Sequence, residues 1–259
     1  MPSEPPDSGG VGCGGPKLRT REGWDPVGAS GVSSSRNVAV GTGHLHNIGA
    51  PADGIIARQR DVKPLVELRV PFELDRQMID DVERGANDSD WQPVKDAAKK
   101  IAFAEDGAIF EGYAGGGIEG IRQGTSNPVE TLPSDVRNYP DAIAHAVNQL
   151  RLVGVDGPYS ALLSADAYTA LAEARDYGDP VLEHVRRLID GEIVWAAAIT
   201  GAFILTTRGG DFDLHIGQDI SIGYSSHTDT AVRLYLQETF TFLLLTAEAA
   251  VALAPAASS

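Results

Sequence analysis

A long amphipathic helix near the middle of the chain limits the possible folds more than any other feature. Asp88–Asp90 followed by Trp91–Pro93 indicates its start, because short polar side chains cap free N–H groups and proline needs no donor in the first turn. The pattern predicts a helix to about Gly112, roughly 30 Å long. One apolar stripe holds Val94, Ala98, Ile101 and Ala108, and Phe103 and Phe110 lie nearly opposite it. We therefore expect a spine helix packed between two layers.

A strand precedes this helix. In residues 65–72 apolar side chains alternate with charged ones, which is typical of a strand buried on one face. The apolar set is Val66, Leu68, Val70 and Phe72, and the charged pair is Glu67 and Arg69. Pro71 predicts an edge strand or a strand end, because it cannot donate a backbone hydrogen bond.

The chain after residue 135 alternates helical and strand patterns and then becomes rich in strands. Helices are predicted at 140–153, 164–175 and 180–189, with a short strand at 159–163. From Glu192 the period switches to two residues. The expected strands contain 193–195, 203–205, 212–216 and 232–236. The architecture is therefore predicted to be α+β.

Composition excludes several classes of protein. The chain has 21 Lys and Arg against 36 Asp and Glu, a net charge of −15, which argues against nucleic acid as a ligand. One cysteine excludes an intrachain disulfide, and neither a secretory signal nor a membrane span is recognised, so a cytoplasmic location is expected. Nineteen of the first 38 residues are Gly, Pro or Ser, and we expect residues 1–38 to be disordered.

Two patterns could carry chemistry. Asp211, Asp213 and His215 alternate along one predicted strand, a possible ligand set for a divalent metal in a metal-dependent hydrolase. The solvent face of a strand is the simpler interpretation and is favoured. Glu105 falls within the apolar stripe of the long helix, where a structural ion pair or hydrogen-bond network is favoured over a general acid. No nucleophile elbow, phosphate loop or zinc-protease motif is present, so an enzyme is not expected.

Seven segments in order along the chain carry a family likeness, namely 67–72, 80–91, 104–112, 154–159, 208–212, 217–224 and 232–242. Together they resemble the type 1 encapsulin shell proteins, formerly grouped with linocin-type bacteriocins, and above all their actinobacterial members. The likeness covers about residues 38 to 254.

The resemblance implies a tailed-phage-capsid-like, HK97-type fold with an extended E-loop, a P-domain and an A-domain. Residues 1–38 would form an atypical N-terminal tail, and 39–72 the E-loop with the strand leading out of it. Residues 73–135 would form the P-domain with its spine helix, 136–222 the A-domain, and 223–259 the strands that return to the P-domain.

The resemblance also implies a structural function. Such proteins self-assemble into closed icosahedral nanocompartments, the smallest from sixty copies, around a cargo enzyme such as a peroxidase or a ferritin-like protein. The cargo is received through its C-terminal targeting peptide. No cofactor is expected, because Arg76 and Gln77 stand where some relatives carry a flavin-stacking Trp.

Three surfaces follow from this likeness. A two-stranded E-loop needs neighbouring copies, because its backbone edges are unpaired. Asp176, Tyr177, Gly178 and Asp179 are predicted to form a pore loop at a five-fold axis, with an ordinary acidic loop as the alternative. Asp219, Ile220 and Ile222 are the candidate residual strand of the cargo groove.

The N-terminal segment departs from the family pattern. Relatives usually begin with an amphipathic helix and a Gly-Arg-rich segment that help to form the cargo groove, and residues 1–38 have neither pattern. Part of the groove is therefore missing from the sequence as it stands. We expect the abrupt join near Val38 to reflect a shifted reading frame or a wrong start in the gene model, rather than a true variant.

Overall fold

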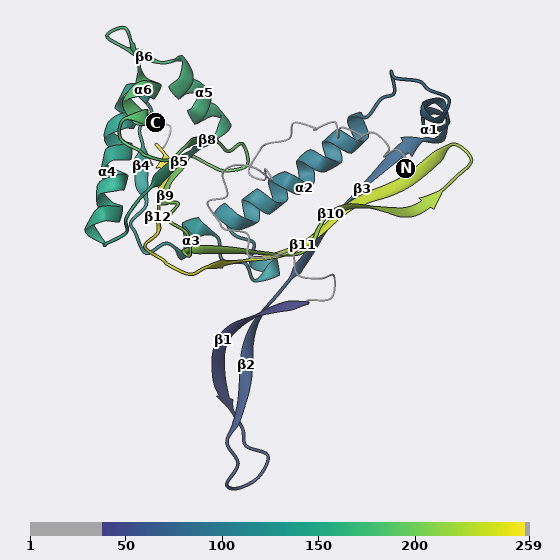
Figure 1. The fold of residues 1–259 in the computed structure, drawn as a ribbon, viewed down its shortest axis with the longest axis horizontal. Helices are drawn as coiled ribbons and strands as arrows, with labels where there is room; N and C mark the ends of the chain where they lie inside the picture. The colour runs from purple at the N-terminus through teal and green to yellow at the C-terminus, as the bar shows by residue number, and fades with distance from the viewer. Residues whose placement is uncertain (1–37, 257–259) are drawn as a thin grey trace, which may run out of the picture.

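A three-stranded antiparallel sheet and the helix that crosses it form the centre of the protomer. The computed structural model describes residues 38–256. The sheet has the order β10-β11-β3, with β10 at Phe212–His227, β11 at Ala231–Leu244 and β3 at Val66–Asp75 (Figure 1). β3 is an edge strand, so Pro71 costs no sheet hydrogen bond on its outer side, and the prediction of an edge strand is confirmed.

The spine helix, α2, spans Gln92–Phe110 and packs on one face of this sheet. Its N-cap residue is Trp91, and the carboxylate of the preceding Asp90 accepts a hydrogen bond of 2.8 Å from the backbone N–H of Gln92, the first residue of the helix. The helix ends two residues before the expected Gly112, which has a φ of 88°. Its N-terminal half packs on the apolar face of β3 predicted from the alternation, with Leu68, Val70 and Phe72 against Ala97 and Ile101.

The predicted stripes of the spine helix need correction. Ala98 is exposed and Phe103 is only partly buried, with the Lys99 ammonium 5.3 Å from its ring centroid. The side chains that are buried along the helix are Ala97, Ile101, Glu105, Asp106, Ala108, Ile109 and Phe110. The sheet covers one side of the N-terminal half, and only the last turn is enclosed by core. The expected layer on the opposite side is therefore absent within residues 38–256.

A five-stranded sheet lies beyond the C-terminal end of α2. Its order is β4-β12-β9-β5-β8, and β5 at Tyr159–Leu163 and β9 at Ala202–Thr206 are buried throughout. The outer members are β4 at Glu130–Leu132 and β8 at Ile193–Trp195, while β12 at Ala250–Pro255 lies between β4 and β9. Strands buried on both faces explain the apolar runs without strict alternation.

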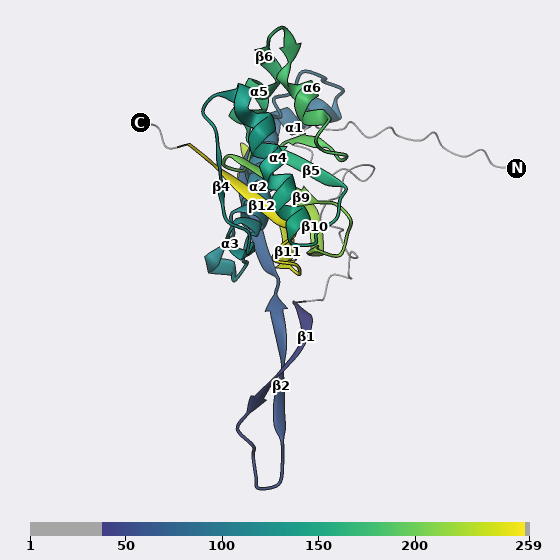
Figure 2. The ribbon, with the colours of Figure 1, turned by 90° about the vertical axis from the view of Figure 1, so that its left-hand side faces the viewer.

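Three helices pack against one face of the five-stranded sheet (Figure 2). They are α4 at Tyr139–Leu152, α5 at Ala165–Glu173 and α6 at Val181–Arg186. Their predicted positions are confirmed within a few residues, including Ser164 as the N-cap of α5. The predicted apolar positions of α4 are all buried, namely Ile143, Ala146, Val147 and Leu150.

Short elements complete the body. α1 at Arg76–Glu83, which the sequence pattern did not predict, lies at the end of the three-stranded sheet farthest from the five-stranded sheet (Figure 1). α3 spans Ile121–Gly124, and two 3-10 turns span Ala114–Gly116 and Val136–Asn138. β6 at Arg175–Asp176 and β7 at Asp179–Pro180 form a small hairpin.

A second, longer hairpin projects away from the body (Figures 1 and 2). Among the described strands, β1 at Ala39–Ile48 pairs with β2 at Ala57–Pro64 and with no other. We refer to residues 39–64 as the arm. In the part of the chain that the structure describes, no helix is long and apolar enough to cross a membrane.

The expected domain division stays a prediction. Residue 222 lies inside β10, so this boundary divides a strand. After residue 223 the chain contributes β11 to the three-stranded sheet and β12 to the five-stranded sheet. The tail assigned to residues 1–38 lies almost entirely outside the described residues.

Candidate assembly and pore surfaces

The arm has no core of its own. Each of its residues is exposed or only partly buried, and its large apolar side chains lie in water. Those about half-exposed or more are Leu45, Ile48, Ile55, Ile56 and Val62. An isolated two-stranded hairpin is marginally stable in water, and its outer edges leave backbone groups unpaired. The arm therefore has the properties of an interface.

A polar contact fixes the register in the middle of the arm. The Thr42 hydroxyl donates a hydrogen bond of 2.9 Å to the Asp61 carboxylate, and His46 Nε2 lies 3.7 Å from the same carboxylate. The Thr42 hydrogen bond is the main reason why the pKa of Asp61 lies below its usual value. These contacts tie β1 to β2 across a bulge between Gly41 and Leu45.

The predicted pore residues form the tip of the β6–β7 hairpin, at the opposite end of the molecule from the arm (Figure 1). Asp176 pairs in register with Asp179, and Tyr177 and Gly178 make the turn with φ values of 47° and 99°. Two successive positive φ values define a tight hairpin turn, which glycine adopts without strain. Tyr177 is fully exposed, and the Arg175 guanidinium donates to the Gly178 carbonyl at 3.2 Å. The pore role itself stays a prediction.

The candidate cargo strand lies on β10. Ile220, Ile222 and Tyr224 alternate along it and are all exposed. Ile222 pairs with Leu236, which is buried under α2, so both side chains lie on the same face of the sheet. The face that α2 covers over β11 thus continues over β10 as an uncovered apolar stripe. Asp219 lies at its start and accepts a hydrogen bond from the backbone N–H of Ile220 at 2.6 Å.

Buried carboxyl groups lie in the spine and the adjacent sheet. Glu105 is 7% exposed, while its structural role stays a prediction. Sequence reasoning missed Asp106, which is 5% exposed, and Glu238 of β11, which is 1% exposed. Burial, followed by the charge of Glu105, raises the pKa of Asp106 to about 8. The position of Asp106 beside the apolar stripe of the helix is the sequence signal that could have predicted its burial.

The hypothesis of a metal-binding hydrolase site is wrong. Asp211 lies before β10, where its carboxylate accepts hydrogen bonds of 3.0 and 2.9 Å from the Arg208 guanidinium. Although burial opposes it, this pairing holds the pKa of Asp211 below its usual value. Asp213 instead pairs with His215 at 2.7 Å. Among the described residues, no three His, Cys, Asp or Glu side chains form a group able to hold a metal ion.

An ion pair between Arg122 and Glu111, which the sequence did not reveal, fixes the C-terminal end of α2. The Arg122 guanidinium donates to both carboxylate oxygens of Glu111 at 2.6 and 3.0 Å and lies 4.5 Å from the Phe203 ring centroid. The backbone N–H of Thr200 donates to the same carboxylate at 3.1 Å. These residues lie up to 92 positions apart in the sequence, from Glu111 to Phe203, so no local motif links them. The contacts join the spine to the five-stranded sheet.

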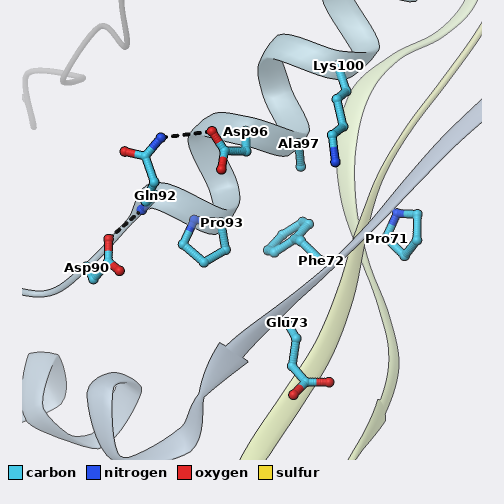
Figure 3. Close-up of a pocket in the computed structure, with 9 residues that line it drawn as sticks. All are labelled: Pro71, Phe72, Glu73, Asp90, Gln92, Pro93, Asp96, Ala97 and Lys100. Atoms are coloured by element: carbon cyan, nitrogen blue, oxygen red, sulfur yellow. Dashed lines mark hydrogen bonds between the residues drawn. The ribbon is translucent and has the colours of Figure 1, made fainter.

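A pocket of about 430 Å³ opens where α2 begins, beside β3 (Figure 3). Phe72, Pro93 and Ala97 form its apolar part. Its polar lining consists of Glu73, Asp90, Gln92, Asp96 and Lys100. The Gln92 side-chain amide donates a hydrogen bond of 2.8 Å to the Asp96 carboxylate, which orders one side of the rim.

The spine helix on a three-stranded sheet, the second sheet and the projecting arm together define a capsid-type fold. The fold matches the virus-like particle from Pyrococcus furiosus at a TM-score of 0.59 and 15% identity over 85% of this chain and 88% of that one. A structure from Gordonia phage Cozz matches at 0.55 and 14% identity over 94% and 92%. The predicted HK97-type α+β fold is confirmed.

The chain belongs to the family described as "Encapsulating protein for peroxidase", which matches residues 17–241. The match begins well before residue 38, where the likeness was expected to start. The type 1 encapsulin shell protein of Mycobacterium tuberculosis is 63% identical over 215 residues, 83% of this chain and 81% of that protein. The resemblance found from the motifs is confirmed, and the chain is a structural shell protein and not an enzyme.

Proposed function

We propose that this chain closes into an icosahedral shell of sixty copies around a peroxidase or ferritin-like cargo in the cytoplasm. The observation that carries the proposal is the arm, whose residues 39–64 bury no core and pair with no other strand among the described residues. Closed point symmetry places every copy in the same surroundings, so each arm can be covered by a neighbour. The described chain offers no other cover for it.

We also infer that the cargo binds on the inner face at the uncovered stripe of β10. Ile220, Ile222 and Tyr224 offer alternating apolar side chains beside α2, a surface that an extended C-terminal peptide can follow. Asp219 adds a negative charge at one end of the stripe. The family description, which refers to encapsulation of a peroxidase, supports a peroxidase as the first cargo to test.

The size of the purified protein tests the shell. Sixty copies of 27.3 kDa give a particle of about 1.6 MDa, which light scattering and electron microscopy distinguish from a small oligomer. We expect closed particles of this mass. A protein that stays below about 100 kDa at every concentration tested would overturn the proposal.

Cargo capture needs a separate test. We expect a co-expressed dye-decolourising peroxidase to co-purify with the shell, and the same peroxidase without its C-terminal peptide to be excluded. Ile222→Ser should lower loading while leaving particle mass unchanged, because the side chain is exposed in the protomer. Leu152→Ser, at an exposed site on α4, is the matched control. Equal loading in both variants would remove the β10 stripe from the cargo site.

A further inference from the structure

We propose that Glu105 of α2 and Glu238 of β11 meet across the interface between the spine helix and its sheet, where they share one proton. The carboxylic acid of one residue donates its O–H to the carboxylate of the other. The inference goes beyond the proposed shell function, because it concerns how the spine helix is held on the sheet of its own chain.

The spine helix carries Glu105 on the face that covers the sheet. Ile101, Glu105 and Ile109 follow each other at intervals of four residues, so they lie on one face of α2. Ile101 belongs to an apolar cluster with Leu236 of β11, and Ile109 belongs to a second cluster with Phe240 of the same strand. Glu105 therefore interrupts an apolar face midway between two packed positions.

The strand β11 carries Glu238 in the same way. Leu236, Glu238 and Phe240 are spaced at two residues, so they point to one face of the sheet. Glu238 pairs in register with Leu68 of β3, and Leu68 packs against both apolar clusters. Directly paired residues of neighbouring strands lie side by side on one face. The buried Glu238 therefore lies under α2.

The spacing of the two elements puts both carboxyl groups at one level. The helix runs along the sheet and contacts β11 (Figure 1). Ile101 and Ile109 lie about 12 Å apart along a helix that rises about 1.5 Å per residue. Leu236 and Phe240 lie about 14 Å apart along a strand that rises about 3.4 Å per residue. Because the packed positions match at both ends, the residues midway between them face each other.

Two carboxylates cannot both stay ionised in this position. Both side chains are withdrawn from water, and like charges at hydrogen-bond distance disfavour the second ionisation. Keeping one proton replaces the repulsion with a charge-assisted O–H···O hydrogen bond, and the proton belongs to the pair rather than to either residue. The neighbouring Asp106 shows how strongly this region favours protonation, since burial and then the charge of Glu105 raise its pKa to about 8.

Other charged groups on the packed elements lie elsewhere. On α2, Lys99 is exposed and Lys100 lines the pocket at the start of the helix. On β3, Glu67 and Arg69 alternate with the residues that face α2, so they lie on the opposite face of the sheet. On β10, Asp219 is exposed. Within residues 38–256, the buried ionisable side chains of α2, β3, β10 and β11 are Glu105, Asp106 and Glu238.

A shared proton makes the contact between helix and sheet sensitive to alkaline pH. Loss of this proton would leave two like charges inside the interface and push α2 away from β11. A glutamine in place of either glutamate removes the need for the proton, because its amide can donate to the remaining carboxylate.

Infrared spectroscopy of the full-length protein at neutral pH tests the shared proton, because a protonated carboxyl group has a C=O band that a carboxylate lacks. Glu105→Gln and Glu238→Gln should each remove the same part of this band. The double variant should lose no more than either single variant, because only one proton belongs to the pair. Asp96→Asn, at an exposed position on α2, is the matched control and should leave the band unchanged.

The size of the loss separates the alternatives. If each glutamate held its own proton, the double variant would lose twice as much as a single variant, and the sharing would be overturned. An unchanged band in all three variants would mean that both carboxylates are ionised, which also overturns it. The spectra require only folded protein, so they decide this inference whether or not the chain closes into shells.

Asp106→Asn covers the case in which the glutamine variants fail to fold. It keeps both glutamates, so about half of the parent's acid band should remain, one of two protons per chain having been removed. Complete loss of the band in Asp106→Asn would assign the whole signal to Asp106 and overturn the shared proton.

Discussion

The arm and the five-stranded sheet are both built from strands, yet they differ completely in what they bury. All ten residues of β5 and β9 are buried, whereas no residue of β1 or β2 is fully buried. The sheet is stabilised by the core of its own chain, and the arm lacks such a core. Folding and assembly therefore depend on separate regions of the chain, so a mutation can disturb one process without disturbing the other.

Replacing the arm is expected to have the largest effect. If residues 41–62 are replaced by a short Gly-Ser linker, particles of about 1.6 MDa should disappear while the body stays folded, because the arm adds nothing to the core. Light scattering measures the particles and circular dichroism measures the fold. An armless chain that still forms closed shells would contradict the assignment of the arm as the assembly element.

A substitution in the core should instead weaken folding. Phe203→Ala should cost about 3–5 kcal/mol of unfolding free energy, because the ring is fully buried and lies 5.3 Å from the Phe110 ring. Urea unfolding in the armless background measures this cost without a contribution from assembly. Leu152→Ala, at a site 77% exposed, is the control and should stay within about 0.5 kcal/mol of the parent. Equal costs would contradict the assigned core.

The spine helix gives a smaller, pH-dependent effect on the stability of the body. Asp106 holds its proton up to about pH 8 in the folded chain, and the unfolded carboxyl loses it near its ordinary pKa of 3.8. Unfolding therefore releases a proton within this window, and stability falls as the pH rises through it. The melting temperature of the armless chain should drop between pH 5 and pH 8 by at least about 2–4 °C, equivalent to about 1 kcal/mol.

Asp106→Asn should flatten that fall, because an amide of nearly the same shape does not titrate in this range. Asp96→Asn, an exposed position on the same helix, is the control and should leave the slope unchanged. Melting curves across the pH series measure both variants. A slope that persists in Asp106→Asn would assign the pH dependence to other groups.

The smallest expected effect on assembly concerns the β6–β7 hairpin. Asp176→Ala combined with Asp179→Ala should leave particle mass unchanged and slow cation entry several-fold, because five copies of each carboxylate would otherwise attract cations at the pore. Terbium uptake into preformed shells, followed by luminescence, measures entry. Unchanged uptake would return this tip to an ordinary acidic loop, and lost assembly would place it with the arm as an assembly element.

Local patterns predicted most of the fold. The alternation in residues 65–72 identified β3 and its apolar face, and the spacing of Ile143, Ala146 and Leu150 identified α4. The stripe on α2 shifted from Ala98 to Ala97, because a helix with apolar residues on several sides does not by itself indicate which side the sheet covers. α1 was missed because Asp80, Asp81 and Glu83 dilute its apolar pattern.

The candidate surfaces were less predictable than the fold. Alternation along a strand groups Asp211, Asp213 and His215, whereas in the fold Asp211 pairs with Arg208 and Asp213 pairs with His215. The pocket joins residues 71–73 to residues 90–100, so no single motif contains it. Such sites depend on tertiary packing, which a single sequence shows only after the fold is known.

The position of β12 in the sheet determines when the five-stranded sheet can be completed during synthesis. β12 is the last strand among residues 38–256, yet it lies inside the five-stranded sheet between β4 and β9. Until residues 250–255 have left the ribosome, β4 has no strand partner among the described residues, and both β12 and β4 are missing from the sheet. The arm is among the first described segments to emerge, while the five-stranded sheet of the body is completed only with β12. Because contacts distant in sequence form late, the five-stranded sheet is expected to be completed only after β12 has been synthesised, long after the arm.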